Sequence, residues 1–155
     1  MHLPGIPAVD PAVRTDLKRL IENMPASRFL GIVVKGFATE GVSVLELPIR
    51  EELTFDGRTA QGGIVGALAD YAGVSAAACT LAEGWVATTT AFEVQNLEPA
   101  AGLALVAVGR LVRMGKSSGV SRAEVFARRE GGSGPALTLV CIATTSCRPF
   151  RLAGA

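Results

Sequence analysis

The sequence has few of the residues on which many enzymes depend for proton transfer and metal binding. Of its 155 residues one is histidine and three are cysteine, and aromatic residues make up 5%. The single histidine, His2, lies beside the N-terminus, which argues against a histidine-activated serine or cysteine nucleophile and against a histidine-rich metal site. Acid–base chemistry in this chain therefore falls to carboxylates, and we expect no metal.

The cysteines show no pairing pattern either. Cys79, Cys141 and Cys147 are odd in number and form no C-x-x-C or zinc-ligand spacing. They are typical of buried, reduced thiols in a reducing compartment. The first residues contain no basic segment followed by an apolar run, so no secretory signal is predicted, and we expect a cytoplasmic protein.

The chain also lacks an excess of charge of one sign. Fifteen Lys and Arg residues against 14 Asp and Glu leave a formal net charge of +1, which provides no broad basic surface for nucleic acid or an anionic membrane. With 49% hydrophobic residues, a chain of this length fits one domain, residues 1–155, around a substantial core. We therefore expect a single domain that acts on a small molecule.

The hydrophobic pattern predicts an α+β domain that begins with a helix. Asp10 is a predicted N-cap with Pro11 at the first helical position, and apolar residues then recur at helical spacing as far as Met24. Pro25 should end this helix, and residues 29–32 should form a packed loop or a short strand.

Alternating and continuous apolar runs predict the rest of the fold. A strand is expected over residues 42–49 and a long helix from Gly62 to about Leu81. Four strands are expected after the long helix, over residues 86–97, 103–114, 119–129 and 136–148. Because the breaks between these four are short and rich in turn residues, consecutive strands should pair antiparallel.

Asp70 is the only charged residue between positions 60 and 82. An ionised group costs several kcal/mol to bury without compensation, so a lone acid in so apolar a helix indicates a functional residue. A transmembrane span is the alternative, because roughly 20 apolar residues cross a bilayer. The glycines, the mid-span acid and the strands that follow disfavour a span.

A helical wheel separates small from larger side chains around Asp70. The face that carries the acid also carries Gly63, Gly66, Ala67, Gly73, Val74 and Ala77. The opposite face carries Val65, Leu68, Ala72, Ser75 and Cys79, and we expect it to lie on the sheet. The face of small residues would let a ligand or another backbone approach the acid closely.

Gly62 and Gly63 are predicted to open the long helix. The first amides of a helix lack partners and could bind a carbonyl oxygen that becomes negative during acyl transfer, although paired glycines can also serve only a tight turn. About 12 Å of helix separates Gly62 from Asp70, too far for both groups to act on one carbonyl. Two antiparallel copies of the helix could combine them, so we expect an obligate homodimer with sites at its interface.

The same segment resembles the hotdog-fold acyl-CoA thioesterases, most closely the PaaI-like family associated with phenylacetic acid degradation. In that family a His-Gly-Gly turn opens the central helix, and a Leu-Ala-Asp triplet places its acid nine residues after the histidine. The matching residues here are Gln61-Gly62-Gly63 and Leu68-Ala69-Asp70. The segments 92–100 and 109–125 resemble the family's following strand and hairpin, so the likeness covers residues 29–148.

The resemblance implies a long central helix wrapped by an antiparallel sheet, assembled as homodimers and often as homotetramers. Asp70 would be the nucleophile or the general base, and the Gly62 amide of the partner subunit would polarise the thioester carbonyl. Gln61 replaces the family's histidine, so this position cannot carry a proton. Val74 stands where some relatives place a hydroxyl that holds water.

Coenzyme A carries phosphates, so a basic loop is expected beside the site. The candidates are Lys116, Ser117 and Ser118, with Arg113 and Arg148 behind them. The resemblance implies hydrolysis of an aromatic or medium-chain acyl-CoA with no cofactor. A hotdog dehydratase is disfavoured because it uses a histidine, whereas a non-catalytic acyl-CoA-binding protein remains the alternative.

Overall fold

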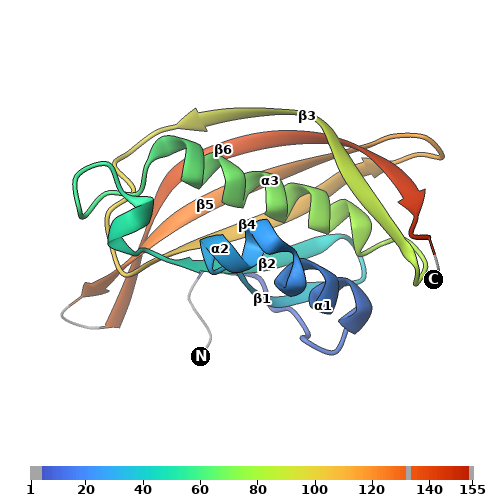
Figure 1. Cartoon of the computed structure of the whole chain (residues 1–155), viewed down its shortest axis with the longest axis horizontal. Coiled ribbons are helices and arrows are strands. Elements are labelled where there is room, and N and C mark those ends of the chain that lie inside the picture. The colour runs from blue at the N-terminus through green and yellow to red at the C-terminus, as the bar shows by residue number, and fades with distance from the viewer. Residues whose placement is uncertain (1–4, 132–133, 154–155) are drawn as a thin grey trace.

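The computed structural model describes residues 5–131 and 134–153, and the predictions for His2 and for the turn at 132–133 lie outside these ranges. In the described chain a six-stranded antiparallel sheet packs against a long helix (Figure 1). The elements are α1 (Thr15–Asn23), α2 (Pro25–Leu30), β1 (Val33–Ala38), β2 (Val42–Pro48), the 3-10 helix η1 (Glu51–Leu53), α3 (Gly62–Ala78), β3 (Trp85–Asn96), β4 (Ala104–Met114), β5 (Gly119–Gly131) and β6 (Gly134–Arg151).

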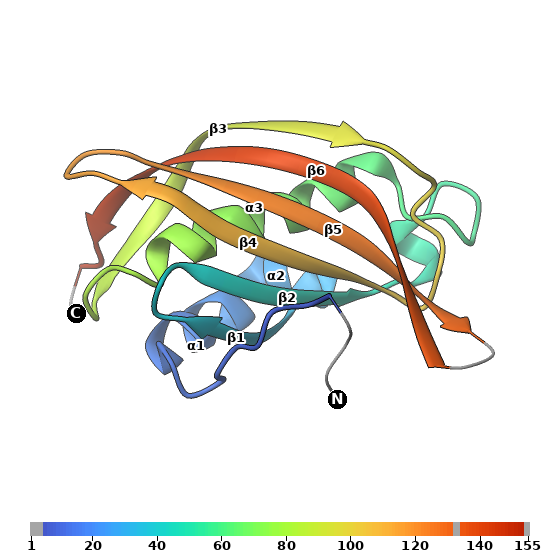
Figure 2. The same ribbon diagram turned by 180° about the vertical axis from the view of Figure 1, so that it is seen from behind.

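The strand order is β1-β2-β4-β5-β6-β3. The predicted antiparallel pairing of consecutive strands is confirmed for β4 with β5 and for β5 with β6, but it is wrong for β3, which pairs with β6 at the edge of the sheet. The connection between β3 and β4 is therefore not a hairpin. It passes beside the segment that precedes α3, where the Ala60 amide donates to the Ala100 carbonyl. Figure 2 shows the other face of the sheet, which α3 does not cover.

The N-terminal helix differs from its prediction at both ends. It begins at Thr15, not at Pro11, because Arg14 has a left-handed backbone with φ of 49°. Asp10 instead exchanges backbone hydrogen bonds with Phe37 of the edge strand β1. Pro25 begins the short helix α2, which replaces the loop or strand expected from residue 29, and β1 was not predicted.

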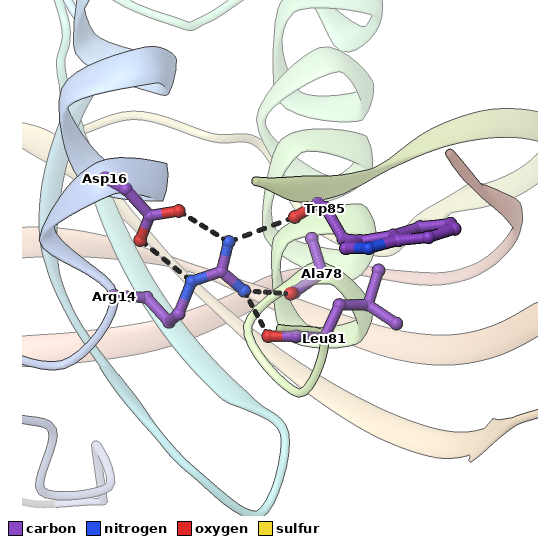
Figure 3. Close-up of polar contacts among 5 residues, drawn as sticks. All are labelled: Arg14, Asp16, Ala78, Leu81 and Trp85. Atoms are coloured by element: carbon purple, nitrogen blue, oxygen red, sulfur yellow. Dashed lines mark hydrogen bonds and ion pairs between the residues drawn. The ribbon is translucent and has the colours of Figure 1, made fainter. Parts of the chain in front are cut away.

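Arg14 joins α1 to the end of the long helix (Figure 3). Its guanidinium donates to the carbonyl oxygens of Ala78 at 2.8 Å, Leu81 at 2.6 Å and Trp85 at 3.0 Å. It also donates twice to the Asp16 carboxylate, which is why the pKa of Asp16 lies below its usual value. A nearly buried cation thus binds carbonyls at and just beyond the C-terminal end of α3, where the helix dipole favours positive charge.

The long helix lies unusually close to the sheet. Its larger face is buried as predicted, with Val65, Leu68 and Ala72 almost inaccessible to solvent. The face of small residues is covered only in part, because the sheet curves around the helix: Gly66 and Gly73 are buried, whereas Asp70 and Val74 remain partly exposed. Gly73 faces Thr145 of β6 and Gly66 faces Val94 of β3.

A second close contact involves a backbone carbonyl of the helix. The Ser43 hydroxyl of β2 donates to the Ala72 carbonyl at 2.6 Å, and a side chain at Gly109 of β4 would collide with the same carbonyl. Residues without bulky side chains therefore bring α3 and the sheet together. None of the helices in the described ranges is long and apolar enough to pass through a bilayer.

Substitution of two glycines of α3 by alanine should change the free energy of unfolding in opposite directions. A Cβ at Gly73 would lie 2.5 Å from Thr145 Oγ1 and 2.9 Å from Thr145 Cβ, whereas a Cβ at Gly66 would be in ordinary contact, 3.4 Å from Val94. Gly73→Ala should lower the free energy of unfolding by about 1–3 kcal/mol through overpacking. Gly66→Ala should raise it by up to about 1 kcal/mol, because alanine favours the helix. Urea denaturation tests both, and equal changes would contradict the close packing at Gly73.

Candidate active site

Asp70 lies half-buried in the middle of α3, where it faces the edge strand β3. The hydroxyl of Thr89 donates to its Oδ1 at 2.8 Å. Immediately after Thr89 the pairing of β3 with β6 shifts register at a β-bulge, a feature often found beside active sites because it redirects side chains. Thr89 is the site residue that the sequence did not indicate, since nothing distinguishes it from the threonines on either side.

The surroundings of Asp70 favour its neutral form. Burial raises the pKa of the carboxyl above its usual value, and the hydrogen bond from Thr89 opposes that change. The ion pairs of the described residues involve other carboxylates, so no cation compensates the charge. An ionised Asp70 is consequently a stronger base than an aspartate in water. Burial and the Asp70 charge also raise the pKa of Tyr71.

The start of α3 presents one free amide. Gln61 is the N-cap, and its Oε1 accepts from the Gly63 amide at 2.6 Å. The Gly62 amide has no hydrogen-bond partner within the described chain. The side chain of Asn96, at the end of β3, lies next to Gly62, with Nδ2 2.9 Å from where a Cβ would stand. An anionic oxygen could therefore bind at Gly62, whereas the Gly63 amide is already occupied.

Asp70 and the start of α3 remain apart within one chain. Eight residues of continuous helix separate Asp70 from Gly62, which corresponds to about 12 Å. Thr89 and Asn96, the β3 residues that border these two groups, are also well apart, seven residues or about 23 Å along the strand. One subunit thus has both groups without bringing them together.

The predicted coenzyme A residues divide between two locations. Lys116, Ser117 and Ser118 form the exposed turn between β4 and β5. Thr89 pairs with Cys147 of β6, and Cys147 pairs with Gly119, the residue that directly follows this turn. Two strand spacings, about 10 Å, separate Thr89 from this turn.

Arg113 and Arg148 lie elsewhere. Arg148 is exposed and alternates along β6 with the buried Cys147, so it lies on the face of the sheet away from Asp70. Arg113 pairs with the exposed Val120 on the same outer face. The structure does not bring these two arginines to the carboxylate.

A cavity of about 230 Å³ opens beside Asp70, between α1 and α3. Its lining consists of Leu17, Ile21, Met24, Asp70, Tyr71, Val74, Ser75 and Ala78. Val74 thus borders a cavity next to the acid, as its position one turn later suggested. The helix α1 was predicted from the sequence, but its role as a wall of this cavity was not. In the described residues no cluster of three or more His, Cys, Asp or Glu side chains could hold a metal ion.

Part of the chain matches a known protein family. Residues 58–133, from just before α3 through β5, match the family model of the thioesterase superfamily. No curated protein matches the sequence.

Three solved structures share the fold. A thioesterase family protein from Silicibacter pomeroyi is 22% identical with a TM-score of 0.80, and the match covers 91% of this chain and 100% of that one. A thioesterase from Haemophilus influenzae is 20% identical with a TM-score of 0.72, over 90% and 91%. The E. coli PaaI protein, from the phenylacetic acid degradation operon, is 21% identical with a TM-score of 0.73, over 96% and 99%.

The central helix, the edge strand and the following hairpin fall within the family match, and the fold of the described chain agrees with that of the solved thioesterases. The resemblance inferred from Gln61-Gly62-Gly63 and Leu68-Ala69-Asp70 is therefore confirmed. Residues 58–133 thus match the thioesterase superfamily, the described chain has the hotdog fold of the solved thioesterases, and together they identify a thioester hydrolase.

Proposed function

We propose that this enzyme hydrolyses an aromatic or medium-chain acyl-CoA to a carboxylic acid and free coenzyme A, with Asp70 as the reacting carboxylate. The observation that carries the proposal is the half-buried Asp70, which is held by Thr89 and faces a cavity without a compensating cation. Such a carboxylate is pre-positioned and more basic than one in water. The reaction needs no metal or organic cofactor, and the three buried free thiols suit a cytoplasmic enzyme.

The chemistry has two routes that start from the ionised Asp70. As general base it takes a proton from water, whose oxygen attacks the thioester carbonyl carbon, and the C–S bond then breaks to release coenzyme A, which leaves as the thiol after taking up a proton. As nucleophile it attacks the carbonyl carbon itself, expels coenzyme A and forms an anhydride that water hydrolyses. In both routes an oxyanion develops on the carbonyl oxygen and needs a fixed N–H donor.

The free Gly62 amide of the partner subunit is the proposed donor. The edge of β3 has no neighbour in the described chain, and a 12-residue open edge can pair with its own copy. An antiparallel pairing with the twofold axis between Phe92 and Glu93 would put Thr89 of one strand opposite Asn96 of the partner subunit. Since Thr89 contacts Asp70 and Asn96 borders Gly62, this register supports two composite sites in each homodimer.

The turn between β4 and β5 is the proposed contact for the phosphates of coenzyme A. Lys116 has a flexible ammonium group, and Ser117 and Ser118 have hydroxyls. All three are exposed, two strands away from Thr89. Phosphate recognition needs such charge-assisted donors. Arg113 and Arg148 face the other side of the sheet. In this proposal they can contact the coenzyme A portion of a substrate only when that substrate is bound by a neighbouring subunit.

The outer face of the sheet supports further assembly into a homotetramer. A groove of about 610 Å³ runs across it, and its lining includes the exposed Ile142 together with Arg110, Arg122, Glu93 and Glu124. Both signs of charge flank apolar surface, so this patch can complement its own copy about a twofold axis.

The first test is the loss of the carboxylate charge. Asp70→Asn should lower kcat about 10²–10⁴-fold, because neither route proceeds without a base or nucleophile. The same change should raise the free energy of unfolding at pH 7, since a charge that burial disfavours is removed while Thr89 keeps an acceptor. Release of coenzyme A and urea denaturation measure the two effects. Full turnover by the variant would exclude Asp70 as the reacting group.

The pH profile tests the role of Thr89. A raised pKa means that Asp70 becomes protonated at a higher pH than an ordinary aspartate, so kcat/KM should fall as the pH drops through that raised value. Thr89→Val removes the hydrogen bond that lowers the pKa and should move the acidic limb to still higher pH. Thr88→Val, at the exposed neighbouring position, is the matched control. An acidic limb that is unchanged in Thr89→Val would contradict this assignment.

Subunit mixing tests the composite site. Gly62→Pro deletes the proposed donor, and proline suits this position because it is the first of the helix and follows the extended Gln61. Asp70→Asn and Gly62→Pro homodimers should both be inactive. A mixed dimer contains one intact site and should recover about half of the wild-type turnover per dimer, on the assumption of independent sites. Gly62→Ala keeps the amide and is the control. Failure of mixed dimers to recover activity would refute sites shared between subunits.

A further inference from the structure

The cavity between α1 and α3 extends from Asp70 along the central helix. Its lining on α3 proceeds from Asp70 through Val74 to Ala78, eight residues or about 12 Å along the helix. The opposite wall consists of Leu17, Ile21 and Met24, which share one face of α1. The cavity is therefore an apolar channel with the carboxylate at one end.

We infer that this cavity is the acyl-binding site and that α1 determines which acyl groups are hydrolysed. This inference rests on the proposed acyl-CoA hydrolysis by Asp70. The volume of about 230 Å³ lies below the roughly 300–1,000 Å³ typical of pockets that enclose a drug-sized ligand. The cavity can hold a phenyl ring or a medium-length alkyl chain, whereas the much larger coenzyme A portion must remain outside.

The polar groups of the lining define the class of acyl group. Asp70 and Tyr71 are adjacent in the sequence, so both mark the same end of the channel. Further along, the Ser75 hydroxyl already donates to the Tyr71 carbonyl and is not free to donate to a ligand. An acyl group that ends in a carboxylate would bury a charge there without a free donor, at a high cost in free energy, because Arg14 is outside the lining and its five N–H groups already donate to Asp16 and to three carbonyls. The site should therefore select apolar ends and reject dicarboxylic acyl groups.

Arg14 keeps the α1 wall in place. Its bonds to the carbonyls of Ala78, Leu81 and Trp85 fasten the first turn of α1 to the far end of the channel (Figure 3). The residues of this wall lie before position 58 and so outside the segment that matches the family. Acyl selection thus depends on a part of the chain that is separate from the segment shared with the family.

The test is a change in chain-length preference caused by Leu17, the residue of the α1 wall nearest to Arg14 and therefore to the far end of the channel. The substrates are butanoyl-, hexanoyl-, octanoyl-, decanoyl- and phenylacetyl-CoA, with adipoyl-CoA as the charged counterpart of hexanoyl-CoA. Leu17→Phe should lower kcat/KM at least about tenfold for the longest acyl group that the wild type accepts, relative to the shortest. Leu17→Ala should move the preference to longer groups. Arg19→Ala, on the exposed side of α1, should leave the profile unchanged.

Three outcomes separate this inference from the proposed function. If the wild type releases coenzyme A but both Leu17 variants, folded as their thermal unfolding shows, keep its profile, α1 does not border the acyl group. Hydrolysis of adipoyl-CoA as fast as hexanoyl-CoA would overturn the apolar assignment. Absence of turnover on every substrate would instead refute acyl-CoA hydrolysis. Should Leu17→Phe fail to fold, Val74→Phe narrows the same channel from α3 and should give the same loss for long acyl groups.

Discussion

The close contact between the central helix and the curved sheet is the constraint on which the other features of this protein depend. Gly73 meets Thr145 at a distance that leaves no space for a methyl group, and Gly109 leaves room for the Ala72 carbonyl. Larger residues at these positions would push α3 away from β4 and β6. Because Asp70 is one turn from Gly73, the same displacement would also remove the acid from Thr89 on β3. Small residues in the helix thus serve both the packing and the site.

That packing creates a conflict between stability and function at Asp70. The close fit excludes water, which raises the pKa of the carboxyl and disfavours the charge that the chemistry needs. Thr89 compensates in part with one hydrogen bond, and no cation completes the compensation in the described chain. A full ion pair would stabilise the carboxylate but would make it a weaker base. Enzymes commonly keep a destabilised group where reactivity requires it.

The chain divides into a segment shared with the family and an N-terminal segment attached to it. The helix, edge strand and hairpin of residues 58–133 contain Asp70 and Gly62. The preceding helix α1 lies over the open side of α3 and is held there by Arg14, whose left-handed backbone starts the helix at Thr15. The nearly buried guanidinium of Arg14 thereby links α1 to the segment that matches the family. In our interpretation the shared segment performs the reaction and α1 selects the acyl group.

The sequence by itself was sufficient for the fold class, for the course of α3 and for the five strands β2 to β6, because long apolar runs with clear breaks depend on local periodicity. It also singled out Asp70, since an isolated charge in an apolar helix is conspicuous without any structure. The pairing of β3 with β6, the role of Thr89 and the placement of Arg148 on the far face were decided only by the tertiary structure. Each depends on contacts between residues far apart in the chain, and neither local periodicity nor residue type specifies which strand a given edge will meet.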